Sequence, residues 1–473
     1  MAGPRGPANP HAPDGGWGWV ICLSSFMMQA LTIGATYTFG IMYVDLLDYF
    51  KESRSATAWI GSIQPALLYF TGIIGSPLLK RFGWRTISIS GAFLAAVGFG
   101  TSALTPNVYL LYLTYGVLTG IGYGLMYVTS MVAVQHYFDK RRAMATGLAV
   151  SGSGVGTLFF GFVIPILLQK FGWRWTLVFE AGISLFIGVF FGALYRPLQL
   201  LEMEETEKLI GNGSTFPNYG GEASSNNHEK IIEDPEPEHK SCCGGCWSLV
   251  KELFDLSLFL NPAFAIFSFA ILLFTFGYHV PYTYTPDRAS QEFGIEPTKA
   301  AFLVSIMGMA NVASRLVFGW IGDKNETVRH FMTAIVLTLG GAVSAVIFLW
   351  NNYTMLVVYS VLFGAFSGCF ASLFPVVLVD FTGFDMIERS IGLALAFGSI
   401  GFLFASPLSG WIIDLTKSFD APFYVVGSAQ AFGGLMFFIY VCYRHCCRCR
   451  SRIEVILSEE PRHRRRYISE TFS

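Results

Sequence analysis

The stretch AAFLVSIMGMANVASRLVFGW, residues 300–320, is long and apolar enough to cross a bilayer, yet it contains an arginine. A membrane-spanning helix needs roughly 20 residues, and a charge inside one usually faces a cavity or a partner instead of lipid. Asn311 precedes Arg315 by about one helical turn, so both side chains should project from the same face. We interpret this face as the centre of a substrate pathway. The alternative is that Arg315 extends to the lipid headgroups.

The composition of the whole chain is that of a polytopic membrane protein. Of its 473 residues, 53% are hydrophobic and only 13% are charged, whereas a soluble domain carries about 25% charged residues. The predicted spans contain no pair of a nucleophile and a base, and no cluster of metal-binding side chains. We therefore expect no enzymatic activity, no cofactor, no metal and no nucleic-acid partner, and the lipid bilayer as the surroundings.

Hydrophobic runs predict twelve membrane-spanning helices, with a polar stretch after the sixth. This stretch is rich in acidic residues, as in EDPEPE at 233–238, and cannot bury enough apolar surface to fold alone. The helices are predicted at 17–48, 58–79, 86–104, 107–134, 142–169, 173–195, 258–285, 298–320, 328–350, 353–380, 389–414 and 419–443. The chain then divides into an N-terminal segment 1–16, a six-helix half 17–195, a linker 196–256, a second half 257–443 and a basic tail 444–473.

The distribution of Lys and Arg predicts the orientation of the chain. If both termini and the linker lie on one side, that side holds most of the 31 Lys and Arg residues. The positive-inside rule places this side in the cytoplasm.

The two halves resemble each other where their fifth helices begin. RAMATGLA at 142–149 corresponds to RSIGLALA at 389–396. Two related six-helix halves with a site between them are similar to the major facilitator architecture. The predicted fold class is therefore an all-α membrane protein with twelve transmembrane helices and the major facilitator fold.

The motif DGGWGW at 14–19 opens the first predicted helix. Asp14 is suited to cap this helix, with Gly15 beside it. Trp17 and Trp19 are suited to the inner membrane interface.

Three further motifs stand later in the chain. YFDKRRAMATGLA at 137–149 contains Lys140, Arg141, Arg142 and Gly147, and FGWR at 171–174 and GALYRP at 192–197 follow. In their order and spacing, these motifs resemble the signatures of the monocarboxylate transporter family, a branch of the major facilitators. The resemblance implies a plasma-membrane transporter of a small carboxylate, and a single-span ancillary glycoprotein as a partner that some members use.

The resemblance also implies roles for residues along the pathway. Arg315 occupies the position of an arginine that pairs with the substrate carboxylate. Asn311 replaces a proton-relaying aspartate, and Tyr37 replaces a lysine of the first helix. Because neither replacement ionises near neutral pH, we predict facilitated diffusion by alternating access. Proton-coupled symport is the alternative, with His279 or Glu180 carrying the proton.

Other side chains are candidates for the same pathway. His279 has a suitable reference pKa of about 6.5, although it could equally be a hydrogen-bonded histidine near the outer interface. Tyr278 could stack on an aromatic or cationic group. Phe366 lies in the region where the family uses an aromatic residue for size selection, and its small neighbours favour a substrate bulkier than lactate. Aromatic amino acids, creatine-like zwitterions and thyroid-hormone-like molecules remain alternative substrates.

Overall fold

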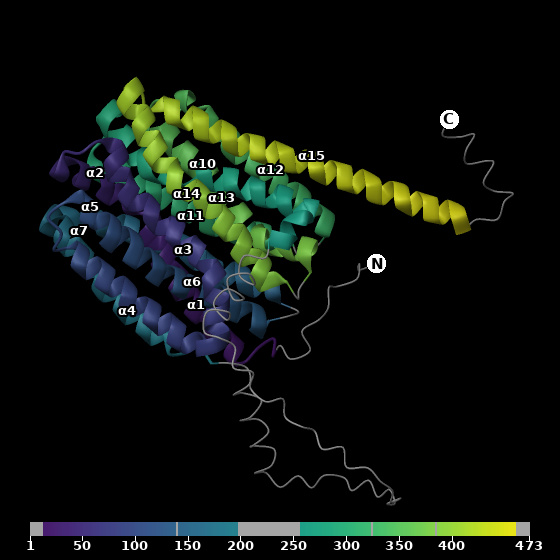
Figure 1. The fold of residues 1–473 in the computed structure, drawn as a ribbon. Coiled ribbons are helices and arrows are strands. Elements are labelled where there is room, and N and C mark those ends of the chain that lie inside the picture. Colours follow the sequence, from purple (N-terminus) through teal and green to yellow (C-terminus); the bar gives the residue numbers. More distant parts are fainter. Residues whose placement is uncertain (1–12, 139–140, 197–255, 323–324, 384–385, 460–473) are drawn as a thin grey trace, which may run out of the picture. The chain divides into compact units, whose positions relative to one another are not determined.

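The computed structural model describes residues 13–138, 141–196, 256–322, 325–383 and 386–459. All of the predicted linker except its end residues 196 and 256, most of the N-terminal segment and the last part of the tail lie outside these described residues. The chain between them is helical (Figure 1).

The first half contains α1 to α7. Their bounds are α1 Trp17–Tyr37, α2 Phe39–Phe50, α3 Arg54–Phe82, α4 Trp84–Ser102, α5 Val108–Leu111, the π-helix η1 Tyr112–Leu118, α6 Thr119–Tyr137 and α7 Arg142–Gly192.

The second half contains α10 to α15. Their bounds are η2 Leu256–Leu260, α10 Pro262–Phe293, α11 Pro297–Gly322, α12 Glu326–Ala345, η3 Ile347–Leu349, α13 Tyr353–Thr382, α14 Ile387–Thr416 and α15 Asp420–Glu459.

These elements make twelve spans. Ten helical stretches in the described part of the chain are long and apolar enough to cross a membrane. One of them, in α7, is divided at Gly172, whose φ of 78° is readily adopted only by glycine. α4 packs on α6 and α7 and completes the twelve, although it is less apolar than these ten. The predicted first helix is α1 followed by α2, with a turn at Thr38 between them. The fold class predicted from the hydrophobic runs is therefore confirmed.

The last helix is longer than its hydrophobic run indicates. We expected it to end near residue 443, with a tail from 444, whereas α15 continues to Glu459. In Figure 1 α15 runs past the ends of the helices beside it. A charged sequence can continue a helix once the apolar span has nucleated it, because each added residue costs little.

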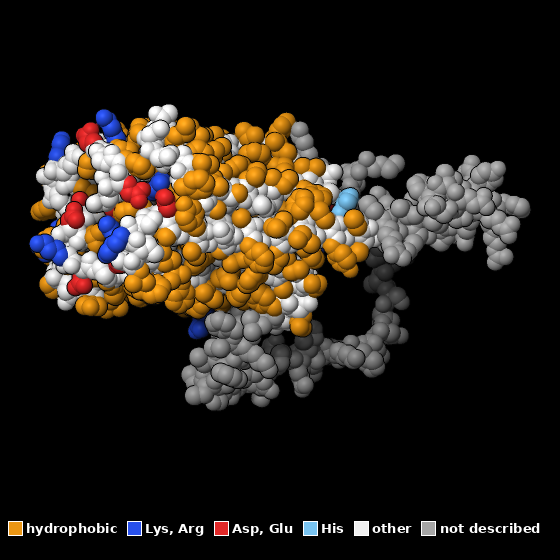
Figure 2. Space-filling view, turned by 90° about the horizontal axis from the view of Figure 1, so that it is seen from above, with side chains coloured by type: hydrophobic (Ala, Val, Ile, Leu, Met, Phe, Trp, Pro, Cys, Tyr) orange, Lys and Arg blue, Asp and Glu red, His pale blue; other side chains and the backbone are white. Residues whose placement is uncertain are grey.

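The surface separates apolar from charged side chains. Figure 2 shows hydrophobic side chains along most of one face, and Lys, Arg, Asp and Glu gathered at one end. We call this the distal end. The connection from α2 to α3, residues 51–53, lies at this end (Figure 1). α1 begins and α7 ends at the opposite, terminal end, where Trp17 Nε1 donates to the carbonyl of Leu194. This arrangement fits a protein whose apolar belt lies in the bilayer and whose charged end lies in water.

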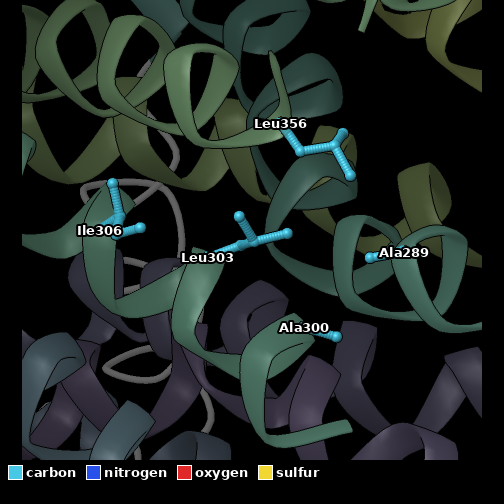
Figure 3. Close-up of a cluster of buried hydrophobic side chains, with 5 residues drawn as sticks. All are labelled: Ala289, Ala300, Leu303, Ile306 and Leu356. Carbon is cyan, nitrogen blue, oxygen red and sulfur yellow. The ribbon is translucent and has the colours of Figure 1, made fainter. Parts of the chain in front are cut away.

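A small apolar cluster stabilises the second half near its distal end. Ala289 of α10, Ala300, Leu303 and Ile306 of α11, and Leu356 of α13 are buried together (Figure 3). The cluster packs the end of α10 and the start of α11 against α13.

The two halves meet along helices with small residues. α3 packs on α14, and α7 packs on α11. A Cβ placed on Gly154 of α7 would lie 2.8 Å from the carbonyl oxygen of Gly308 in α11. Such close approach of backbones is typical of membrane helix interfaces.

Candidate functional site

A cavity lies between the two halves, where about 620 Å³ of space, open solvent included, is not filled by atoms. Its lining comes from both halves, which is the arrangement that lets a rocking motion expose one site to either side. From the first half the lining residues are Gln29, Ile33, Tyr37, Tyr69, Tyr127, Met131, Val150 and Ser153. From the second half they are Ile271, Phe274, Thr275, Tyr278, Arg315, Phe370, Ala371, Phe374, Leu395 and Phe402.

Arg315 is the charged residue of this lining. Its side chain leaves α11 and reaches α7, where Nη1 donates to the carbonyl of Val150 and, at 2.6 Å, to Ser153 Oγ. The residue is only 3% exposed, and its Nε has no hydrogen-bond partner among the described residues. The ion pairs found in the described chain do not include Arg315. A buried guanidinium with neutral partners and an unused donor is costly unless an anion joins it.

Aromatic rings cover the cavity on the distal side. Tyr37 of α1 stacks on Tyr282 of α10, with ring centroids 4.9 Å apart, and meets Tyr278 edge-on at 5.1 Å. The hydroxyls of Tyr37 and Tyr69 lie 3.1 Å apart. Tyr69 in turn stacks on Phe402 of α14 at 4.9 Å. The hydroxyl pair lies within the first half, whereas the ring pairs Tyr37–Tyr282, Tyr37–Tyr278 and Tyr69–Phe402 cross between the halves and close the cavity toward the distal end.

An ionic layer lies beyond the aromatic rings at the distal end. Arg54 of α3 pairs with Asp287 of α10 at 2.5 Å, and its backbone N–H donates to Asp414 of α14 at 3.1 Å. The guanidinium also lies over the ring of Phe419, 5.0 Å from its centroid. One arginine of the first half thus contacts α10, α14 and the connection before α15, and these contacts hold the distal end closed.

The predicted pathway residues are only partly brought together. Arg315, Tyr37 and Tyr278 line the cavity. Asn311 does not, because its short side chain turns to α13 and donates to Ser367 Oγ at 3.1 Å. Asn311 and Arg315 therefore leave α11 from one side but end at different partners.

His279 and Phe366 also lie outside the cavity lining. His279 is buried, with Nδ1 3.0 Å from Ser406 Oγ of α14. Phe366 packs toward α12, where its Cβ would lie 3.4 Å from a Cβ added to Gly340. The aromatic residue that α13 contributes to the cavity is Phe370, one turn later. Phe370 and not Phe366 is therefore the candidate on α13 for contact with a substrate in this cavity.

The signature residues gather at the terminal end. Asp14 does not cap α1, which has Gly16 at its N-cap and no side-chain cap. Instead Asp14 bridges the two motifs, since its N–H donates to Tyr137 and its Oδ1 accepts from the N–H of Arg141 at 3.4 Å. Trp19 meets Phe138 edge-on at 5.1 Å.

Of the remaining signature residues, the two glycines are fully described and the two basic residues are not. Gly15 lies close to the backbone of Pro13, and a Cβ on Gly147 would meet no atom within 4 Å. Lys140 lies outside the described residues, and for Arg142 only the backbone, at the start of α7, is described.

Sequence reasoning missed several lining residues, namely Gln29, Tyr69, Tyr127 and Phe402. Gln29 could have been found, because a buried amide within an apolar span is unusual. It donates to Ser130 Oγ at 2.9 Å. The three aromatic residues carry no such signal, because Phe and Tyr occur throughout the spans.

Comparison with known proteins identifies the family. The chain matches the Major Facilitator Superfamily over residues 25–338 and 289–445. It is 30% identical to Monocarboxylate transporter 12 of Xenopus laevis over 426 residues, which covers 90% of this chain and 88% of the relative. It is also 30% identical to Monocarboxylate transporter 13 of Rattus norvegicus over 416 residues, covering 88% and 87%. For Monocarboxylate transporter 3 of Gallus gallus the identity is 30% over 450 residues, covering 94% and 81%. The chain therefore belongs to the monocarboxylate transporter family of the Major Facilitator Superfamily, and is a membrane transporter and not an enzyme.

Proposed function

We propose that this transporter carries a solute with a single carboxylate by alternating access, and that Arg315 holds the carboxylate in the central cavity. The observation that carries the proposal is the buried guanidinium of Arg315, which lines the cavity and has neutral partners and an unused Nε donor. The names of its relatives as monocarboxylate transporters support the same substrate class.

The chemistry of the site favours one negative charge on the substrate. Guanidinium presents parallel N–H groups that match the two oxygens of a carboxylate. Arg315 is the single cation of the described lining, so a dicarboxylate would bring a second charge into an apolar space without a partner. Val150 and Ser153 fix one side of the guanidinium, which reduces the entropy lost when the substrate binds.

The proposal includes facilitated diffusion in place of obligatory proton coupling. A coupled carrier needs a group beside the substrate that gains and loses a proton. The described cavity lining contains neither a carboxylate nor a histidine. His279 is turned to Ser406, and Glu180 is buried beside Tyr115 and Tyr123 within the first half.

We further propose the plasma membrane as the location, with both termini in the cytoplasm. The excess of Lys and Arg on the side of the termini supports this orientation. A single-span ancillary glycoprotein is the partner that the family resemblance supports.

The test is uptake by Arg315→Lys at matched surface expression, with a panel of labelled carboxylates in vesicles. We expect uptake to fall at least about tenfold, because lysine keeps the charge but loses the paired hydrogen bonds. Arg174→Lys is the matched control, since Arg174 is exposed and lies over the rings of Tyr49 and Trp173. Equal uptake by wild type and Arg315→Lys would remove the carboxylate role.

A further inference from the structure

The lining of the central cavity is rich in aromatic side chains. Eight of its eighteen residues are Phe or Tyr, and they come from α1, α3, α6, α10, α13 and α14. An alkyl acid as small as propionate would offer these rings little more than an ethyl group. The lining therefore offers more aromatic side chains than a short-chain acid can contact.

The rings are held in place by one another. Phe274 lies 4.1 Å from Phe370 between centroids, and 4.9 Å from Tyr278. Tyr69 and Phe402, from opposite halves, are parallel within 14°. Because such pairs hold each other in place, the cavity presents flat apolar walls before a substrate enters. Flat walls of this kind favour a planar, aromatic body over a branched aliphatic one.

The charges of the cavity distinguish an acid from an amino acid. Arg315 is the charged residue of the lining, and no Asp or Glu is part of the described lining. An ammonium group would therefore enter without an anionic partner, and the positive charge of Arg315 would repel it. The faces of Tyr rings can attract a cation, but this attraction is weak compared with an ion pair.

We propose that the preferred substrate is an aromatic monocarboxylate anion without an amino group. Its carboxylate meets Arg315, and its ring lies among Phe274, Phe370, Tyr278 and Phe402. The inference rests on the proposed carboxylate role of Arg315 and adds the chemical class of the rest of the molecule. It excludes zwitterions such as aromatic amino acids as the preferred cargo.

The experiment compares three matched compounds with the full chain in proteoliposomes. The probe is labelled 3-phenylpropionate, and the competitors are unlabelled propionate and phenylalanine. We expect propionate to compete at a concentration at least about tenfold higher than unlabelled 3-phenylpropionate, because it lacks the ring. Phenylalanine should compete at least about tenfold more weakly as well, because its ammonium has no partner.

A pair of variants on α13 tests the position of the ring. Phe370→Leu keeps an apolar side chain but removes one wall, and should lower the preference for 3-phenylpropionate over propionate by about threefold or more. Phe366→Leu, one turn earlier and outside the lining, should leave this preference unchanged. The preference is a ratio measured in one preparation, so a loss of folded protein does not alter it.

The outcomes separate this inference from the proposed function. If propionate and 3-phenylpropionate compete equally and both depend on Arg315, the carboxylate role stands and the aromatic class is wrong. Equal competition by phenylalanine and 3-phenylpropionate would show that the Tyr rings accept an ammonium, and would also overturn the inference. If no carboxylate of any kind is carried, the proposed function itself fails.

Discussion

At the scale of single residues, side-chain length decides what Arg315 and Asn311 can do. The two residues lie one turn apart on α11, but the arginine reaches across to Ser153 on α7 while the asparagine ends at Ser367 on α13. The Oδ1 of Asn311 is buried and has no hydrogen-bond partner in the described chain. A polar atom is thus available one turn from the cation of the cavity, but it is a neutral one.

Replacing this amide by a carboxylate should create an internal competitor for the substrate. In Asn311→Asp the new negative charge lies one turn from Arg315, where opposite charges attract. We expect the KM for a carboxylate substrate to rise about tenfold while kcat changes less, measured as initial uptake rates over a range of concentrations. Asn311→Ala, which removes the amide without adding charge, is the control. An unchanged KM in Asn311→Asp would show that position 311 is electrostatically separate from the site.

At the scale of elements, glycine sets how close two helices can approach. α1 packs against α7, and Cβ atoms added to Gly152 and Gly156 of α7 would overlap the carbonyl groups of Phe26 and Ala30. These glycines lie one turn apart, so their absent side chains form a continuous groove for α1. Because α1 carries Gln29 and Tyr37 to the cavity, this approach also sets the width of the site.

Gly156→Ala should therefore destabilise the protein, because backbone on α1 cannot move aside as a flexible side chain can. Overpacking of this kind typically costs about 1–3 kcal/mol, and we expect a lower temperature of thermal unfolding in detergent, followed by size-exclusion chromatography. Gly182→Ala on the same helix is the matched control, since a Cβ there meets nothing within 4 Å. If both variants unfold at the same temperature as wild type, α1 and α7 are less closely packed than described.

At the scale of the whole molecule, the two halves are joined at the distal end by one buried ion pair and its neighbours. Asp287 is fully buried, whereas the side chain of Arg54 is 20% exposed and also contacts Asp414, with Nε 3.9 Å from Oδ1. The two partners are therefore unequal. Arg54 has a second anionic partner, Asp414, and is partly exposed to solvent. Asp287 has Arg54 as its cationic partner among the described residues.

This inequality predicts that Arg54→Gln is more harmful than Asp287→Asn. The first leaves a buried carboxylate unpaired, which typically costs about 3–5 kcal/mol, and the second leaves an arginine that keeps Asp414. We expect a larger fall in unfolding temperature for Arg54→Gln, and partial recovery in the double variant, which removes both charges. The reverse order of the two single variants would contradict the described roles.

A carrier without a proton site should move net charge when it transports an anion. In proteoliposomes, an inside-positive potential of about 100 mV should drive uptake, since moving one charge through it is worth about 2.3 kcal/mol. An inward proton gradient at zero potential should produce no accumulation. Accumulation that follows the proton gradient and collapses with a protonophore would overturn facilitated diffusion. If His279→Gln also abolished that accumulation, the proton site would lie on α10.

The sequence alone determined the class of the protein and its two-half organisation. Span length, the acidic interruption and the repeated RAMATGLA and RSIGLALA segments are local properties, and a bilayer permits few arrangements of helices that long. The choice of Arg315 as a cavity residue also followed from sequence, because a charge in a span must face something polar. The signature motifs, taken together in their order along the chain, indicated the family.

Only the tertiary structure decided which other side chains line the cavity with Arg315. Neighbouring residues on a helix point about 100° apart, and one turn advances about 5.4 Å. Tyr278 therefore lines the cavity while His279 turns to α14, and Phe370 lines it while Phe366 does not. The rotation and depth of each helix depend on the packing of its neighbours, through contacts far apart in the chain such as Tyr69 with Phe402. That information is absent from the hydrophobic pattern of any single helix.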